Sequence, residues 1–93
     1  PRRMISKDAY LKIYLTPDNY LFIKYLRNDK CSSEYVTLRI SDIMGREVYS
    51  KRFINSNGNG FESFLEIPAL AKGLYICQLI DNDFVLTEKI IID

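Results

Sequence analysis

The sequence predicts an all-β fold, an antiparallel sandwich of about seven strands. The chain has 93 residues, of which 47% are hydrophobic and 27% charged, a balance typical of one globular domain. Its Ile, Leu, Val, Tyr and Phe residues fall in short segments separated by turn-forming Gly, Pro, Asn and Asp. The sequence shows no convincing helical periodicity and no internal repeat, so we expect strands joined by turns.

Segments rich in β-branched and aromatic residues define the expected strands, at residues 10–15, 20–26, 35–42, 46–53, 61–67, 74–80 and 84–92. The first strand ends before Pro17, because proline has no N–H to donate to a ladder, and Asp18 and Asn19 favour a turn. The second strand is apolar on both faces except at Lys24. It is therefore expected in the interior of its sheet.

The third expected strand alternates in polarity along its length. The apolar residues of its inward face are Val36, Leu38 and Ile40. This period of two predicts one face in the core and one in water. A tight turn follows at Met44 and Gly45, because Gly45 can take the positive φ that a hairpin requires, and the fourth strand then returns.

The polar segment 55–60, Asn-Ser-Asn-Gly-Asn-Gly, is the strongest loop signal and is interpreted as a hairpin connection. A phosphate-binding loop would need a lysine and a helix directly after the glycines, whereas the next residues are typical of a strand. Residues 68–73 link the fifth and sixth strands. We expect Gly73 there to be left-handed and Leu70 to plug the bottom of the core.

The sixth expected strand is apolar on both faces except at Gln78, which indicates a central position in its sheet. Asp81, Asn82 and Asp83 then turn the chain into the last strand. Clustered oxygen atoms suggest calcium, but three residues in a tight turn cannot supply six ligands, and Asp and Asn favour turns for backbone reasons. No metal site is therefore expected.

The sequence offers no constellation of catalytic residues. It contains no histidine, which removes the commonest general base and the ordinary serine or cysteine triads. Glu62 and Glu66 share one strand face, a pattern typical of a solvated surface. The seven tyrosines are scattered over several strands and are expected mainly to build the core and its margin. We predict a protein that is not an enzyme and that needs no cofactor.

Charge and cysteine content exclude several further classes. Thirteen basic and twelve acidic residues give a net charge of +1, so nothing favours a nucleic-acid partner. Residues 1–9 are interpreted as a lead or linker, and the absence of a starting Met and of a signal peptide leads us to expect a fragment of a longer precursor. Cys31 and Cys77 would allow one disulfide, but their spacing fits neither a zinc site nor Cys-x-x-Cys. Two free thiols are favoured over a bridge.

Three motifs follow one another in the second half of the chain. They form an Asp-x-x-Gly-Arg turn, a Leu-x-x-Gly-x-Tyr corner and a basic, aliphatic ending, made by Asp42, Gly45, Arg46, Leu70, Gly73, Tyr75, Lys89, Ile90, Ile91, Ile92 and Asp93. In order and spacing this succession resembles the C-terminal sorting domain family of the type IX secretion system (Por secretion system). The opening Tyr14-Leu15-Thr16-Pro17 departs from the family's Tyr-Pro-Asn-Pro-like segment, keeping only the tyrosine and the second proline.

The resemblance implies an immunoglobulin-like sandwich over residues 10–93 that acts as the secretion signal of a larger Gram-negative cargo protein. Members of the family fold in the periplasm, pass an outer-membrane translocon with the help of shuttle proteins, and reach the outer membrane surface or are secreted. There a sortase usually removes the domain and joins the cargo to anionic lipopolysaccharide. The partner would supply the chemistry and this chain a recognised shape. If the last strand, Phe84 to Asp93, lies at a sheet edge, its unpaired backbone groups are open to strand addition.

Two other interpretations stay open. The chain is also compatible with a sorting domain retained on a component of the secretion machinery, or with a non-catalytic immunoglobulin-like adhesion or carbohydrate-binding module. The second of these is suggested by the fold and the tyrosines. Short sandwiches can exchange a terminal strand, so a strand-swapped dimer of the isolated domain is a further expectation.

Overall fold

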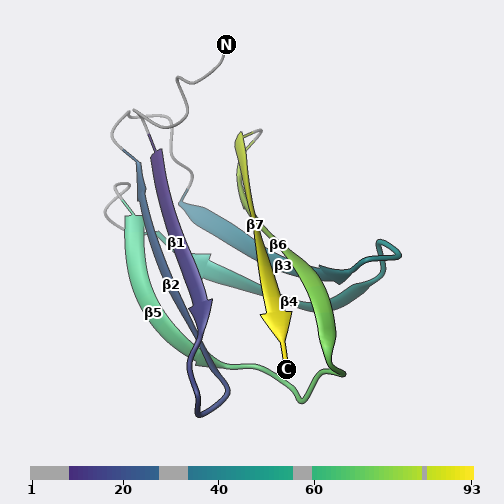
Figure 1. Cartoon of the computed structure of the whole chain (residues 1–93). Helices are drawn as coiled ribbons and strands as arrows, with labels where there is room; N and C mark the ends of the chain where they lie inside the picture. Colours follow the sequence, from purple (N-terminus) through teal and green to yellow (C-terminus); the bar gives the residue numbers. More distant parts are fainter. Residues whose placement is uncertain (1–8, 28–33, 56–59, 83) are drawn as a thin grey trace.

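The computed structural model describes residues 9–27, 34–55, 60–82 and 84–93. Its strands in chain order are β1 (Ala9–Leu15), β2 (Tyr20–Arg27), β3 (Tyr35–Asp42), β4 (Glu47–Ile54), β5 (Gly60–Glu66), β6 (Gly73–Asp81) and β7 (Phe84–Ile92). This described part contains strands and turns but no helix (Figure 1). The predicted all-β fold is therefore confirmed.

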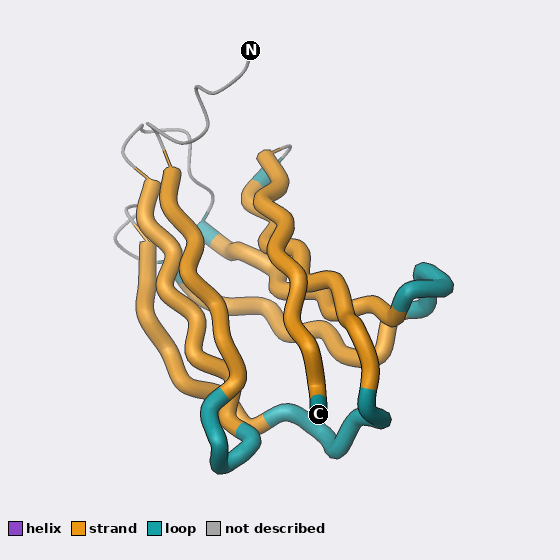
Figure 2. The backbone as a smooth tube through the Cα atoms, in the orientation of Figure 1, coloured by secondary structure: helices purple, strands orange, loops and turns teal. Residues whose placement is uncertain are grey.

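The strands form two antiparallel sheets that face each other, with the connections at their ends (Figure 2). One sheet has the order β1-β2-β5 and the other β4-β3-β6-β7. In the constant-type immunoglobulin arrangement the fourth strand joins the sheet of the first. Here β4 pairs with β3 instead, so the sandwich divides into three strands and four.

The positions of the strands within the sheets agree with their sequence patterns. β2 lies between β1 and β5, and β6 lies between β3 and β7. The two segments that are apolar on both faces are thus interior strands, as expected. β7 and β4 are the edge strands of the four-stranded sheet, and β1 and β5 are the edge strands of the other sheet. The last strand therefore meets the condition for strand addition.

The core fills the space between the two sheets. Its fully buried members come from alternate positions of β2, β3 and β6 and include Leu21, Ile23, Tyr25, Val36, Leu38, Ile40, Cys77 and Leu79. Ile90 of β7 also belongs to this cluster, so the last strand contributes to the core. Because each large apolar side chain contributes about 1.5 to 3 kcal/mol on burial, this shared core is the main source of stability.

Three expectations about connections need correction. The segment 55–60 does not connect a hairpin, because β4 and β5 belong to different sheets. Asp81 is not an exposed turn residue, since it ends β6 with 1% of its side chain exposed, and Asn82 takes the positive φ of 61°. Asn55 is buried rather than part of an open loop. Its backbone N–H donates to the carbonyl of Glu34 at 2.7 Å, and its side-chain oxygen accepts from the N–H of Gly60 at 3.0 Å. Residues 56–59 and Asp83 lie outside the described residues.

Arg46 was expected to begin the fourth strand but belongs to the preceding turn. The backbone N–H and the guanidinium of Arg46 both donate to the Asp42 carboxylate. Arg46 is therefore part of the turn, and the pairing of β4 with β3 begins at Glu47. Cys77 is a free, buried thiol, as favoured from the sequence, while Cys31 lies outside the described residues.

Candidate recognition surface

The turn between β3 and β4 is fixed by the carboxylate of Asp42. One carboxylate oxygen accepts hydrogen bonds from the N–H groups of Met44 and Arg46, both at 2.9 Å. The other oxygen accepts from the Nε of Arg46 at 2.9 Å. These bonds favour the charged form, and the backbone bond from Arg46 contributes most to lowering the pKa of Asp42 from its ordinary 3.8. Gly45 supplies the φ of 87° that closes the turn.

The same turn presents two apolar side chains to solvent. Ile43 is 71% exposed and Met44 is 76% exposed. Side chains of this size are not expected at the tip of a turn for reasons of folding, because they contribute little burial there. The Asp-x-x-Gly-Arg motif thus builds a rigid support for an apolar tip.

The link between β5 and β6 is closed by a tyrosine corner. The hydroxyl of Tyr75 donates to the backbone carbonyl of Ala71 at 2.6 Å, four residues upstream. Leu70 packs against the core, as expected for a residue that plugs the bottom of the sandwich. Gly73 has a φ of 150°, and a Cβ built there would meet nothing within 4 Å. It is the backbone conformation, and not lack of space, that favours glycine at this position.

The turn and the corner lie side by side. A hollow of about 210 Å³ is lined by residues of both motifs, namely Asp42, Ile43, Met44, Arg46, Lys72, Gly73, Leu74 and Tyr75. Two motifs separated by about 30 positions in the chain therefore contribute to one surface.

The end of β7 runs along the corner. Gly73 pairs with Ile92, Leu74 with Ile91, and Tyr75 with Ile90. Ile90 is buried and Ile92 packs against the core, whereas Ile91 is 66% exposed. Successive side chains of the strand face opposite ways, so the ending serves the core and the outer surface at once.

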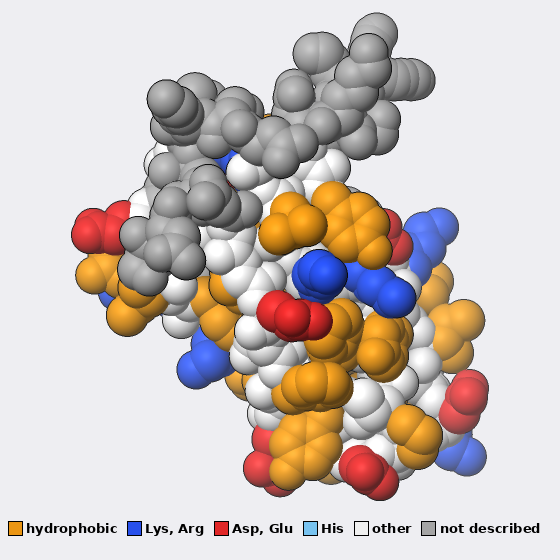
Figure 3. Space-filling view, turned by 90° about the vertical axis from the view of Figure 1, so that its left-hand side faces the viewer, with side chains coloured by type: hydrophobic (Ala, Val, Ile, Leu, Met, Phe, Trp, Pro, Cys, Tyr) orange, Lys and Arg blue, Asp and Glu red, His pale blue; other side chains and the backbone are white. Residues whose placement is uncertain are grey.

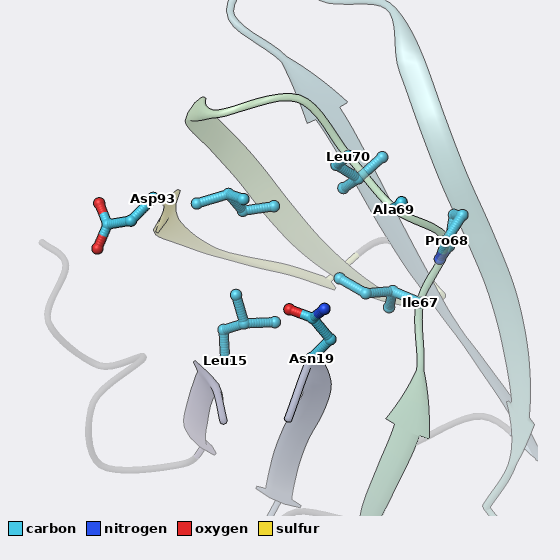
Figure 4. A pocket seen from close by; sticks show the side chains of 8 residues that line it. Leu15, Asn19, Ile67, Pro68, Ala69, Leu70 and Asp93 are labelled. Carbon is cyan, nitrogen blue, oxygen red and sulfur yellow. The ribbon is translucent and has the colours of Figure 1, made fainter. Parts of the chain in front are cut away.

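A second hollow, of about 160 Å³, lies beside the last residues. Its lining comes from the β1–β2 turn, the β5–β6 link and the end of the chain, with Leu15, Asn19, Ile67, Pro68, Ala69, Leu70, Ile92 and Asp93 (Figure 4). The side chains of Leu15 and Asn19 stand across from Leu70, and the Asp93 carboxylate points away from the hollow (Figure 4). An adjoining hollow of about 300 Å³ adds Thr16, Pro17 and Ile91.

We call the area formed by residues 15–19, 42–46, 67–75 and 91–93 the motif surface. It brings together all the motif residues named from the sequence except Lys89 and Ile90. Lys89 pairs with Ile76 further along the strand and is exposed there, and Ile90 is buried in the core. Sequence reasoning missed Asn19, Ile67 and Pro68 as members. The signal that could have found them is their position in turns next to motif residues.

Among the described residues we find neither a metal site nor a helix that could span a membrane. Among these residues no group of three or more His, Cys, Asp or Glu side chains is placed to hold a metal ion. None of the described segments forms a helix with the length and apolar character needed to cross a bilayer. Glu62 and Glu66 are both exposed, as their shared strand face predicted.

The described strands and the motif surface define a small β-sandwich domain of the immunoglobulin-like class. The family model of the secretion system C-terminal sorting domain matches residues 12–93. The chain belongs to this family, the sorting domains of the type IX secretion system, and the resemblance inferred from the three motifs is confirmed. A comparison with curated proteins gives no match.

Proposed function

We propose that the motif surface is the part of the domain that the type IX outer-membrane translocon and its shuttle proteins recognise, before a surface sortase acts on the cargo. Family membership makes the domain a C-terminal sorting signal for export through the outer membrane to the cell surface or for secretion. The particular partners, the passage through the periplasm and the attachment step are our proposal.

The observation that carries this proposal is a strip of exposed apolar side chains on the motif surface. Ile43, Met44, Leu74 and Ile91 are all exposed. Leu74 and Ile91 are direct cross-strand neighbours, and Leu74 lines the same hollow as Ile43 and Met44. Contiguous exposed apolar groups on a rigid, hydrogen-bonded support are typical of protein-binding sites.

The edge position of β7 supplies a second recognition element. On the side away from β6, the backbone N–H and C=O groups of an edge strand can pair with an added strand. The exposed Ile91 and Lys89 would then give such a partner side chains to read. Lys89 also discourages unspecific pairing, because charged residues at edges oppose aggregation.

On this proposal the domain contributes shape and no catalysis. The thiol of Cys77 is buried, and the carboxylate of the Asp42 turn is occupied by hydrogen bonds within the turn. Nucleophile and acid would come from the sortase, and the domain would present the cargo to it.

The experiment is surface display of a fluorescent passenger fused to residues 1–93, in a host with an intact type IX system and in one lacking its translocon. We expect translocon-dependent surface fluorescence. Retention of a folded fusion in both hosts would contradict the sorting role and favour the adhesion-module interpretation.

A pair of matched variants then tests the motif surface itself. Ile91 and Ile54 are 66% and 68% exposed, but Ile54 lies at the far end of β4, opposite Tyr35. Ile91→Asp is expected to reduce export strongly while Ile54→Asp leaves it unchanged, with both domains folded by circular dichroism. Equal export of the two variants would show that the motif surface is not what the translocon recognises.

A further inference from the structure

The outer face of the β1-β2-β5 sheet carries a row of aromatic residues. Tyr14, Phe22 and Phe64 are consecutive partners across the three strands. Their ring centroids are 5.0 Å apart for Tyr14 and Phe22, and 4.9 Å apart for Phe22 and Phe64. The side of the molecule formed by this sheet shows hydrophobic side chains on both sides of a small group of charged ones (Figure 3).

This face was expected to be solvated but is not a polar one. Phe64 lies on the same face as Glu62 and Glu66 and is 61% exposed. Tyr10, Tyr14, Tyr20 and Leu26 are also exposed on this sheet. The inner face already supplies the core, so these side chains form apolar surface that no other strand of the described residues covers.

The charges on the face follow the register of the strands. Lys12, Lys24 and Glu62 form the row next to the aromatic one. On the other side of the aromatic row, Tyr20 of β2 is opposite Glu66 of β5. The central strand therefore carries a cation and a phenol, and its neighbour β5 carries two carboxylates.

We propose that this face binds the same face of a second copy of the chain, in an aligned sheet-on-sheet packing. A two-fold axis along the strand direction, midway between β2 and β5, keeps each row at its own level and places β2 of one copy over β5 of the other. Phe22 then meets the partner subunit's Phe64, and Lys24 meets the partner subunit's Glu62. Tyr20 meets the partner subunit's Glu66.

Charge complementarity is the argument for this occupant. In the packing described, Lys24 and Glu62 of the two copies form a square of alternating charge, so each carboxylate has two cations as neighbours and each lysine two carboxylates. Lys12 lies on β1 at the rim, with no like charge opposite. An anionic lipid surface or nucleic acid would instead meet Glu62 and Glu66, which oppose such a partner.

The geometry of the rings disfavours a sugar as the occupant. The planes of Tyr14 and Phe22 are inclined by 33°, and those of Phe22 and Phe64 by 54°. Tilted rings interdigitate with other aromatic side chains in edge-to-face contacts. They do not form one flat platform on which sugar rings could stack in a row.

The size of the face sets the strength of the association. With strands about 4.8 Å apart and residues about 3.3 Å apart along each strand, the two overlapping strands β2 and β5 cover roughly 200 Å² of each copy. Interfaces that bury less than about 1,200 Å² in total are mostly weak and transient. The dimer is therefore expected to be reversible and to form only at high concentration.

Sedimentation equilibrium of the full chain, from micromolar to millimolar concentration, tests the proposal. The expected result is a monomer at the low end and a dimer at the high end. Phe64→Ser should abolish dimer formation, because it removes an exposed aromatic side chain from the centre of the contact. Met44→Ser is the matched control, since Met44 is 76% exposed but lies in the β3–β4 turn, away from this face. The Met44→Ser chain should form the dimer at the same concentration as the wild type.

Exchanging the charges of Lys24 and Glu62 tests directly whether this face forms the dimer interface. Lys24→Glu and Glu62→Lys each place like charges across the two-fold axis and should weaken association by about tenfold or more. The double variant K24E/E62K restores the alternating square and should recover the dimer. A chain that stays monomeric at millimolar concentration overturns the proposal, as does a double variant no better than the single ones.

A strand-swapped dimer gives a different result in the same experiment. It would persist in Phe64→Ser and in both single charge variants, and it would exchange subunits slowly because a strand must leave its sandwich. That outcome would also overturn the face-to-face packing.

Discussion

The hydroxyl of Tyr25 donates a hydrogen bond of 2.6 Å to the carboxylate of Asp81, and this bond joins the two sheets through the interior of the sandwich. Arg27 approaches the same carboxylate oxygen at 3.3 Å and lies over the ring of Phe84 at 4.3 Å. All three polar residues are buried. Burial, followed by the bond to Asp81, raises the pKa of Tyr25 well above its ordinary 10, so the phenol keeps its proton to donate.

Tyr25→Phe is expected to destabilise the domain by about 1 to 3 kcal/mol, because the buried Asp81 carboxylate loses a donor that water cannot replace. Denaturant unfolding measures the loss. The matched control is Tyr49→Phe, since the Tyr49 hydroxyl makes no hydrogen bond within the described ranges and burial alone raises its pKa. Equal losses of unfolding free energy in Tyr25→Phe and Tyr49→Phe would contradict a special role for the hydrogen bond between the sheets.

The Asp42 turn should make stability depend on pH in the acid range. The pKa of Asp42 is lowered in the folded chain, so its ion pair and hydrogen bonds stabilise fully above the ordinary value of 3.8. This stabilisation is lost as the pH falls through the lower, folded pKa. Asp42→Asn should therefore be less stable than the wild type at neutral pH and should approach it in acid, in unfolding curves taken across that range. A constant difference at all pH values would contradict this.

Cys77 should be unreactive in the folded domain. Burial, with a smaller contribution from Glu88, raises the pKa of its thiol to about 12, so almost no thiolate exists at neutral pH. In a Cys31→Ser chain, a thiol reagent is expected to label Cys77 only after denaturation. Rapid labelling under native conditions would mean that β6 opens readily.

Tyr75→Phe should loosen the link between β5 and β6. It removes the hydrogen bond to the carbonyl of Ala71 and is expected to cost about 0.5 to 1.5 kcal/mol. Hydrogen exchange should become faster at residues 70–73 while the centre of β3 remains protected. Unchanged exchange in the link would show that Leu70, by packing on the core, is sufficient to hold it.

Strand positions could be predicted from the sequence because they depend on local properties. The period of two in β3, the uniformly apolar β2 and β6, and the turn residues after each of them are visible within a few positions. The pairing of β4 with β3 was predicted from the hairpin turn at Met44 and Gly45 and is confirmed. The hairpin expected between β4 and β5 was wrong, because local turn residues do not determine which of the two sheets receives the next strand.

The features that the sequence did not reveal depend on distant partners. Aspartate is common in turns, and the burial of Asp81 is explained by partners far away in the sequence, Tyr25, 56 positions earlier, and Arg27. Glu62 and Glu66 predict a solvated face, but Phe64 lies between them on the same face and is the cross-strand partner of Phe22. The motif residues were found, but the hollow they share with Leu15 and Asn19 arises from chain segments far apart in sequence.

The contribution of Ile90 to the core has a consequence for protein synthesis. β7 is the last strand in the chain, so it leaves the ribosome after the other six strands. A polypeptide truncated before this strand lacks a buried core residue and exposes β6 as a new sheet edge. Only a polypeptide that includes β7 can therefore complete the described sandwich, so the strand that carries the motif ending is also the one that finishes folding.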